Sequence, residues 1–87
     1  MKKHNFSAGP SILPTEVFEK ASQAVIELEG TGLSILEMSH RSKEFVAIME
    51  RARALALELA GLTGKGYQTL FLQGGASLHF YASALNL

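Results

Sequence analysis

The chain has no cysteine and no aspartate among its 87 residues. The absence of cysteine excludes disulfide bonds and thiolate metal sites, and it fits a cytosolic protein. The three histidines, His4, His40 and His79, are never three or four residues apart, so no two of them share one helical face as metal ligands. We therefore expect no metal site in these residues.

The sequence also lacks an excess of charge of either sign and a long apolar run. Eight basic residues balance eight acidic ones, so nothing indicates a nucleic-acid-binding surface or a polybasic membrane patch. No stretch approaches the roughly 18 apolar residues of a membrane span. The basic start, Met1–Asn5, leads into no apolar run of a signal peptide. The composition predicts a soluble chain of one small domain at most.

Strand-like stretches are scarce as well. Only residues 67–73 form the short apolar run that predicts a buried strand, and 33–36 are a second, poorer candidate. A buried strand needs neighbours for its backbone groups. The chain also stops at Leu87 within an apolar helical pattern. We expect it to be part of a longer α/β fold and incomplete on its own.

An irregular N-terminal segment, 4–13, precedes the first amphipathic helical pattern. Pro14 stands at the first position of this helix, where its missing N–H is tolerated. The apolar positions continue at helical spacing as far as Leu28. The glycines at positions 30 and 32 then predict the end of the helix.

A short extended piece at about 33–38 precedes the clearest helix, at about 43–60. Charged residues occupy one face of this helix and apolar residues the other. Its N-cap is either Ser39 or Ser42, and the sequence does not decide between them. We expect the apolar face to pack on other apolar surface; this face contains Phe45, Met49, Leu55 and Leu59.

The strongest functional signal is the stretch Gly74–Ser77, between the expected strand at 67–73 and a helical pattern from Leu78 onward. Glycines allow a sharp turn and bring bare backbone close to a ligand. Ser77 falls near the N-cap of the helix, so its hydroxyl and the first free N–H groups point into one space. A strand, a glycine turn and a helix N-terminus together predict an anion-binding cup.

The glycine-rich stretches allow other interpretations. The cup is equally consistent with an ordinary β-to-α turn in which Ser77 merely caps the helix. A serine nucleophile elbow has the same setting, but His79 stands where that motif has its last glycine. A phosphate loop around Gly64 is excluded, because Leu59 and Gly66 occupy the places of its first glycine and of its Ser or Thr.

His40 and Arg41 precede the second helix and form a second unusual stretch. A cation at a helix N-terminus opposes the helix dipole, so helix stability does not explain the arginine. The planar arginine fork suits a carboxylate or a phosphate, and the pair predicts a second anion site. The alternative is a solvent-exposed arginine without a function.

Three motifs follow one another along the chain. They are Asn5-Phe6-Ser7-Ala8-Gly9-Pro10, Glu37-Met38-Ser39-His40-Arg41-Ser42-Lys43-Glu44-Phe45 and Leu70-Phe71-Leu72-Gln73-Gly74-Gly75-Ala76-Ser77. In order and spacing they resemble the N-terminal part of the phosphoserine aminotransferase family, which consists of pyridoxal-phosphate enzymes of fold type I. The resemblance extends over essentially all of the chain, and it is far more specific than any one motif.

The resemblance implies a role for six residues. Gly75, Ala76 and Ser77 match the position that holds the cofactor phosphate, His40 and Arg41 match the residues that hold the distal anion of the substrate, and Ala8 matches a position beside the substrate. That anion is the phosphate of phosphoserine or the side-chain carboxylate of glutamate.

The implied reaction is amino transfer between O-phospho-L-serine and 2-oxoglutarate, giving 3-phosphooxypyruvate and L-glutamate in serine biosynthesis, with pyridoxal 5′-phosphate as the cofactor. The resemblance further implies a cytoplasmic homodimer. The family's Schiff-base lysine, the carboxylate beside the pyridine nitrogen and the arginine for the α-carboxylate lie outside these residues. Lys65 matches no such lysine. The chain would be an N-terminal fragment that does not catalyse alone.

The resemblance also implies how the chain is divided. Residues 1–14 would form the N-terminal segment, 15–61 a helical part, and 67–87 the strand, phosphate cup and helix of the large cofactor-binding domain. The strand would be the first of a mixed, mostly parallel sheet covered by helices. The alternative is a freestanding anion-binding or interaction module that contains the strand–glycine–helix unit and has no catalytic activity.

Overall fold

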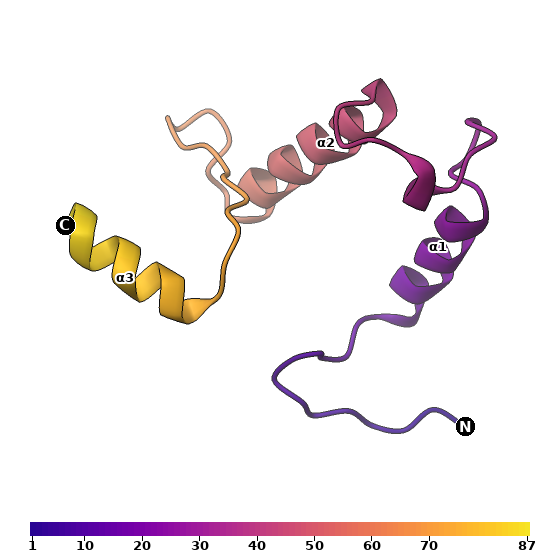
Figure 1. The fold of residues 1–87 in the computed structure, drawn as a ribbon, viewed down its shortest axis with the longest axis horizontal. Coiled ribbons are helices and arrows are strands. Elements are labelled where there is room, and N and C mark those ends of the chain that lie inside the picture. Colours follow the sequence, from indigo (N-terminus) through magenta and orange to yellow (C-terminus); the bar gives the residue numbers. More distant parts are fainter. The chain divides into compact units, whose positions relative to one another are not determined.

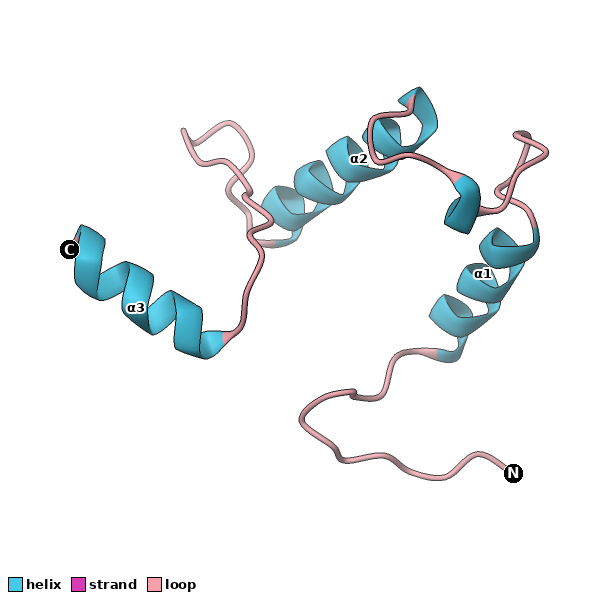
Figure 2. Ribbon diagram, viewed as in Figure 1, coloured by secondary structure: helices cyan, strands magenta, loops and turns pink.

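The computed structural model describes residues 1–87, which form three α-helices, one 3-10 helix and no strand (Figures 1 and 2). The elements are α1 at Thr15–Ile26, η1 at Ile35–Glu37, α2 at Lys43–Leu59 and α3 at Ala76–Asn86. The chain divides into two compact units, Met1–Phe45 and Val46–Leu87. None of the helices combines the length and the apolar character that crossing a bilayer requires.

Helix α1 begins one residue later than the sequence predicts. Pro14 precedes the helix as its N-cap, and the Pro14 carbonyl accepts a hydrogen bond of 2.9 Å from the Val17 N–H. The helix ends before Glu27, which takes an extended conformation. The expected continuation of the helix to Leu28 is therefore wrong, since Leu28 already belongs to the loop that follows.

A tight loop joins α1 to η1 within the unit Met1–Phe45. The Leu28 N–H donates to the Leu33 carbonyl at 2.7 Å, and these two residues form an isolated bridge. The Thr31 hydroxyl donates to the Leu28 carbonyl at 2.6 Å. Gly30 supports this turn with a φ of +79°, a conformation that other residues rarely adopt.

Residues 35–37 form the 3-10 turn η1 in place of the extended piece expected at 33–38. The Ser34 hydroxyl accepts a hydrogen bond from the Leu36 N–H at 3.1 Å, and the Glu37 carboxylate accepts one from the Ser34 N–H at 3.3 Å. This is a capping box. Ser34 is the one buried residue of the chain, and η1 lies against α1.

Ser42 is the N-cap of α2, so the structure decides between the two serines. The Ser42 hydroxyl accepts a 3.3 Å hydrogen bond from the Phe45 N–H, three residues into the helix. Ser39 forms the turn before the helix instead. Its hydroxyl accepts from the Arg41 N–H at 3.2 Å, and its carbonyl accepts from the Ser42 N–H at 3.0 Å.

No strand forms at 67–73 in the structure of these 87 residues, so the strand expected there stays a prediction. A strand requires the backbone of a neighbouring strand. No backbone N–H or carbonyl of 67–73 makes a backbone hydrogen bond in the structure. The mixed, mostly parallel sheet stays a prediction, because this chain does not supply the strands with which 67–73 would pair.

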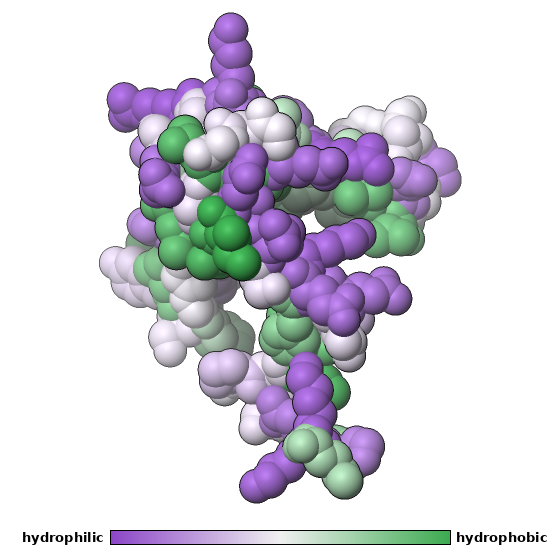
Figure 3. Space-filling view, turned by 90° about the vertical axis from the view of Figure 1, so that its right-hand side faces the viewer, coloured by the Kyte–Doolittle hydropathy of each residue, from purple (hydrophilic) through white to green (hydrophobic).

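Neither unit has an apolar core. No apolar side chain is buried, and Figure 3 shows apolar side chains standing at the surface beside polar ones. In the expected packing face of α2, Leu55 is 37% and Leu59 is 86% exposed. A complete small domain buries most of its apolar surface. The prediction that the chain does not close a core of its own is therefore confirmed.

Candidate cofactor and substrate site

The N-terminus of α3 carries the expected cup. Gly75 is the N-cap, and no side chain caps the helix. Ser77 is therefore not the helix cap that the ordinary-turn interpretation expected. The first helical hydrogen bond joins the His79 N–H to the Gly75 carbonyl at 3.2 Å. The N–H groups of Ala76, Ser77 and Leu78 precede this bond and have no partner in the structure.

Gly74 forms one wall of the cup. Its φ of +104° lies in the region that favours glycine, and a Cβ atom added there would collide with the side chain of Leu78. Helical side chains lean toward the N-terminus of their helix, which explains why Leu78 covers Gly74. At Gly75, by contrast, an added Cβ would meet no atom within 4 Å. The structure thus leaves no room for a side chain at Gly74 and leaves room for one at Gly75.

The groups at this helix end suit an anion with several oxygen atoms. Three unpartnered N–H groups and the positive end of the dipole of the 11-residue helix lie together. The Ser77 hydroxyl belongs to the same first turn, and it makes no hydrogen bond within the chain. The first turn contains no acidic residue that would repel an anion. The residues present therefore fit the phosphate of the expected cofactor.

His40 and Arg41 lie in the turn immediately before α2, in the unit Met1–Phe45. The turn is fixed by Ser39, whose hydroxyl accepts from the Arg41 N–H at 3.2 Å. Both side chains are exposed. The single ion pair of the structure joins Arg53 and Glu50, so the Arg41 guanidinium has no carboxylate partner. The turn holds the backbone and leaves the guanidinium available to an anion.

Ala8 lies in a loop that Asn5 supports from both sides. The Asn5 Oδ1 atom accepts a 2.9 Å hydrogen bond from the Ser7 N–H, and its Nδ2 atom donates to the Pro10 carbonyl at 3.4 Å. Ala8 itself is exposed. Its methyl group can only make van der Waals contacts, so any polar contact at this position comes from the backbone.

The family model for class-V aminotransferases matches residues 3–87. The chain belongs to this family. Over all 87 residues it is 71% identical to a phosphoserine aminotransferase of Flavobacterium johnsoniae and 68% identical to that of Flavobacterium psychrophilum. It is also similar to the solved structure of phosphoserine aminotransferase from Bacillus circulans subsp. alkalophilus, with 46% identity and a TM-score of 0.81 over 91% of the chain.

The chain spans 24% of the length of each of these two Flavobacterium relatives and 22% of the solved structure. The class-V match runs through the N-terminal segment, the turn before α2 and the cup alike, so the resemblance drawn from the three motifs is confirmed. A freestanding module that contains only the cup would not explain this similarity. The serine nucleophile elbow is likewise not supported by an aminotransferase family.

The structure of this class-V aminotransferase chain brings some of the expected site residues together. Gly75, Ala76 and Ser77 meet at one helix end in the unit Val46–Leu87, and His40 and Arg41 are neighbours in the other unit. Ala8 belongs to the same unit as the His40–Arg41 turn, and no hydrogen bond joins it to either residue.

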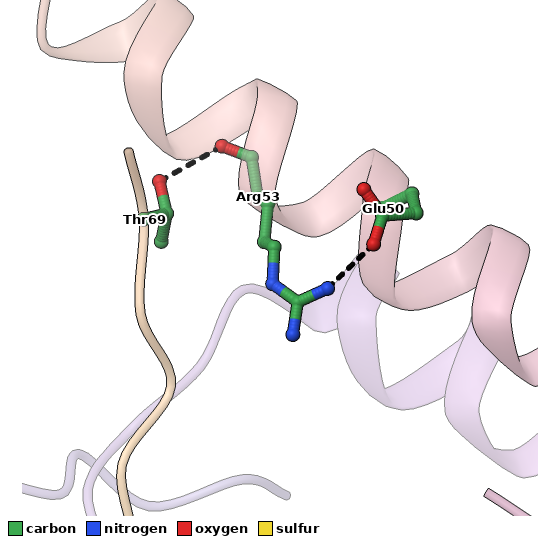
Figure 4. Close-up of polar contacts among 3 residues, drawn as sticks. All are labelled: Glu50, Arg53 and Thr69. Carbon is green, nitrogen blue, oxygen red and sulfur yellow. Dashed lines mark hydrogen bonds and ion pairs between the residues drawn. The ribbon is translucent and has the colours of Figure 1, made fainter. Parts of the chain in front are cut away.

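No sequence motif predicts one polar contact of the segment that leads to the cup. The Thr69 hydroxyl donates to the backbone carbonyl of Arg53 (Figure 4). A single threonine within an apolar run carries no periodic signal, and its partner is a main-chain group 16 residues away. Only the structure shows this link between α2 and the segment that leads to the cup.

Proposed function

We propose that this chain is part of a phosphoserine aminotransferase, which transfers an amino group between O-phospho-L-serine and 2-oxoglutarate. The products are 3-phosphooxypyruvate and L-glutamate. The enzyme would belong to serine biosynthesis and would act in the cytoplasm. The observation that carries the proposal is the 71% identity over every residue of the chain to a relative of that name. The aligned region includes both expected anion sites, so the similarity extends to the residues that would contact cofactor and substrate.

The cofactor would be pyridoxal 5′-phosphate, which when bound supplies a sink for the electron pair released at the substrate's α-carbon. Gly75, Ala76 and Ser77 would hold its phosphate through N–H groups and the Ser77 hydroxyl. Three N–H groups without partners at the start of α3 support this assignment. The wall at Gly74, formed by the Leu78 side chain, would restrict the direction from which the phosphate enters.

His40 and Arg41 would bind the distal anion of the substrate. A guanidinium can hold a phosphate or a carboxylate with two parallel hydrogen bonds. One arginine can therefore serve both phosphoserine and glutamate. Ala8 would line the substrate's position. In a homodimer, we propose that His40 and Arg41 serve the active site of the other subunit.

The rest of the enzyme would supply what these residues lack, namely the catalytic lysine, the carboxylate for the pyridine nitrogen and the arginine for the α-carboxylate. It would also supply the strands that pair with 67–73 in a mixed, mostly parallel sheet. Residues 67–87 would then be a strand, phosphate cup and helix of the large domain. The exposed apolar side chains of the segment, such as Phe71 at 52% and Leu72 at 67%, support this proposal.

A transamination assay on the complete protein tests the function. Glutamate formation from 2-oxoglutarate is measured with O-phospho-L-serine and, as a matched control, with L-serine, which lacks only the phosphate. We expect rapid turnover with phosphoserine, little with serine, and loss of activity when the cofactor is removed. Equal rates for the two amino acids would contradict a site built for a distal anion.

A further inference from the structure

The Thr69 hydroxyl donates a 3.0 Å hydrogen bond to the Arg53 carbonyl of α2 (Figure 4). These residues are 16 positions apart, whereas every other side-chain hydrogen bond of the structure joins residues no more than five apart. Thr69 is also half-buried, while the other residues of 67–73 are exposed. This segment is therefore attached to α2 at one point.

Side chains of α2 support the same point of attachment. Ala54 and Leu57 line a groove together with Gln68 and Leu70, the two neighbours of Thr69. The Arg53 guanidinium is paired with Glu50 at 2.5 Å, away from the Thr69 hydroxyl (Figure 4). The threonine thus meets a main-chain oxygen in a fixed place, since the carbonyl belongs to the interior of a regular helix.

The attachment lies close to the cup in the same unit. Gly74 lies five positions after Thr69, and a chain of that length reaches about 17 Å at most. Without the Thr69 bond, the segment before the cup would be held less firmly against α2, and binding would have to order it.

We propose that Thr69 is a positioning residue for the cofactor phosphate. Its bond to the Arg53 carbonyl anchors the segment that carries Gly74–Ser77, so the N–H groups of the cup are held in place before the phosphate arrives. Thr69 does not touch the phosphate; it acts through the position of the cup. This inference rests on the proposed pyridoxal-phosphate function.

The test is a titration of the complete enzyme, freed of cofactor, with pyridoxal 5′-phosphate. Thr69→Val keeps the shape of the side chain and removes the donor, while Thr69→Ser keeps the donor. Thr63→Val is the matched control, because Thr63 is exposed and makes no hydrogen bond. We expect Thr69→Val to raise the dissociation constant about five-fold, the factor that corresponds to the net value of one hydrogen bond. Thr69→Ser and Thr63→Val should match the wild type.

The outcomes separate positioning from simple stabilisation. If Thr69→Val lowers the melting temperature of the cofactor-free and cofactor-bound enzymes equally and leaves the dissociation constant unchanged, the bond only stabilises the fold and the inference is overturned. If Thr69→Val does not fold, Thr69→Ala compared with Thr69→Ser gives the same contrast in the hydroxyl. A wild-type enzyme that binds no pyridoxal phosphate would instead overturn the proposed function itself.

Discussion

The Ser42 hydroxyl accepts a 3.3 Å hydrogen bond from the Phe45 N–H, and this contact places Arg41 just outside α2. Had Ser39 been the cap, His40 and Arg41 would form the first turn of the helix. Instead, Arg41 precedes the cap, with its N–H bonded to the Ser39 hydroxyl and its guanidinium exposed. The two serines together hold the arginine in a defined turn.

Removing the Ser42 hydroxyl should therefore affect both stability and substrate binding. In the complete enzyme, we expect Ser42→Ala to lower the free energy of unfolding by about 1 kcal/mol, the usual value of an N-cap. The Michaelis constant for phosphoserine should rise, because the turn that carries Arg41 loosens, while cofactor affinity stays the same. Urea denaturation and steady-state kinetics measure these effects.

Ser22→Ala is the control for that substitution. The Ser22 hydroxyl donates to the Glu19 carbonyl within α1 at 2.9 Å, a bond that contributes little to a helix. We expect Ser22→Ala to change neither the free energy of unfolding nor the Michaelis constant. A Ser42→Ala enzyme with wild-type constants would show that the cap does not support the arginine.

The isolated 87-residue chain should not fold cooperatively. No apolar side chain is buried in either unit, so no core opposes the loss of chain entropy. We expect calorimetry to show no sharp unfolding transition, and sedimentation to show association through exposed apolar segments. A single cooperative transition of a monomeric 87-residue chain would contradict this prediction.

Gly74→Ala should damage the cup more than an equivalent change elsewhere. Alanine at Gly74 faces both an unfavourable φ of +104° and a collision with Leu78, while Gly30, the control, has a φ of +79° and open space around it. We expect Gly74→Ala to lower the free energy of unfolding by about 1–3 kcal/mol and to weaken cofactor binding. Gly30→Ala should leave cofactor binding unchanged. Equal effects of the two on the cofactor dissociation constant would contradict a role for the Gly74 wall.

The helices and their caps could largely be predicted from the sequence, because they depend on contacts between residues three or four apart. The apolar period located α1 and α2, and Ser42 was one of two cap candidates. The capping box of Ser34 and Glu37 is also a local signal, but an extended piece was expected there. The strand at 67–73 could not be settled locally, because its partners are not among these residues.

The candidate site shows the same division between local and distant contacts. The cup at Gly74–Ser77 follows from glycines beside a helical pattern, and the structure places its N–H groups at a helix start. Its cap could not be assigned from composition, since Gly75 takes the place expected of a serine. The Thr69 bond to Arg53 joins residues that are distant in the sequence, so the local sequence pattern does not predict it.

The separate roles of the cup and of the turn before α2 are tested most directly by measuring cofactor affinity and substrate kinetics in the same variants of the complete enzyme. We expect Ser77→Ala to weaken the binding of pyridoxal phosphate by about 1 kcal/mol. Arg41→Ala should leave the cofactor absorbance intact. It should lower kcat/KM for phosphoserine and glutamate, with a loss of transition-state stabilisation of about 2–4 kcal/mol. Arg41→Lys should recover only part of that loss, because an ammonium group cannot make the forked contact.

The decisive comparison is cofactor titration against kcat/KM for Ser77→Ala and Arg41→Ala. A cofactor defect confined to Ser77→Ala, with a substrate defect in Arg41→Ala, is the predicted result. Loss of cofactor in Arg41→Ala with unchanged substrate constants would contradict the assignment of the cup to the cofactor and of the turn to the substrate.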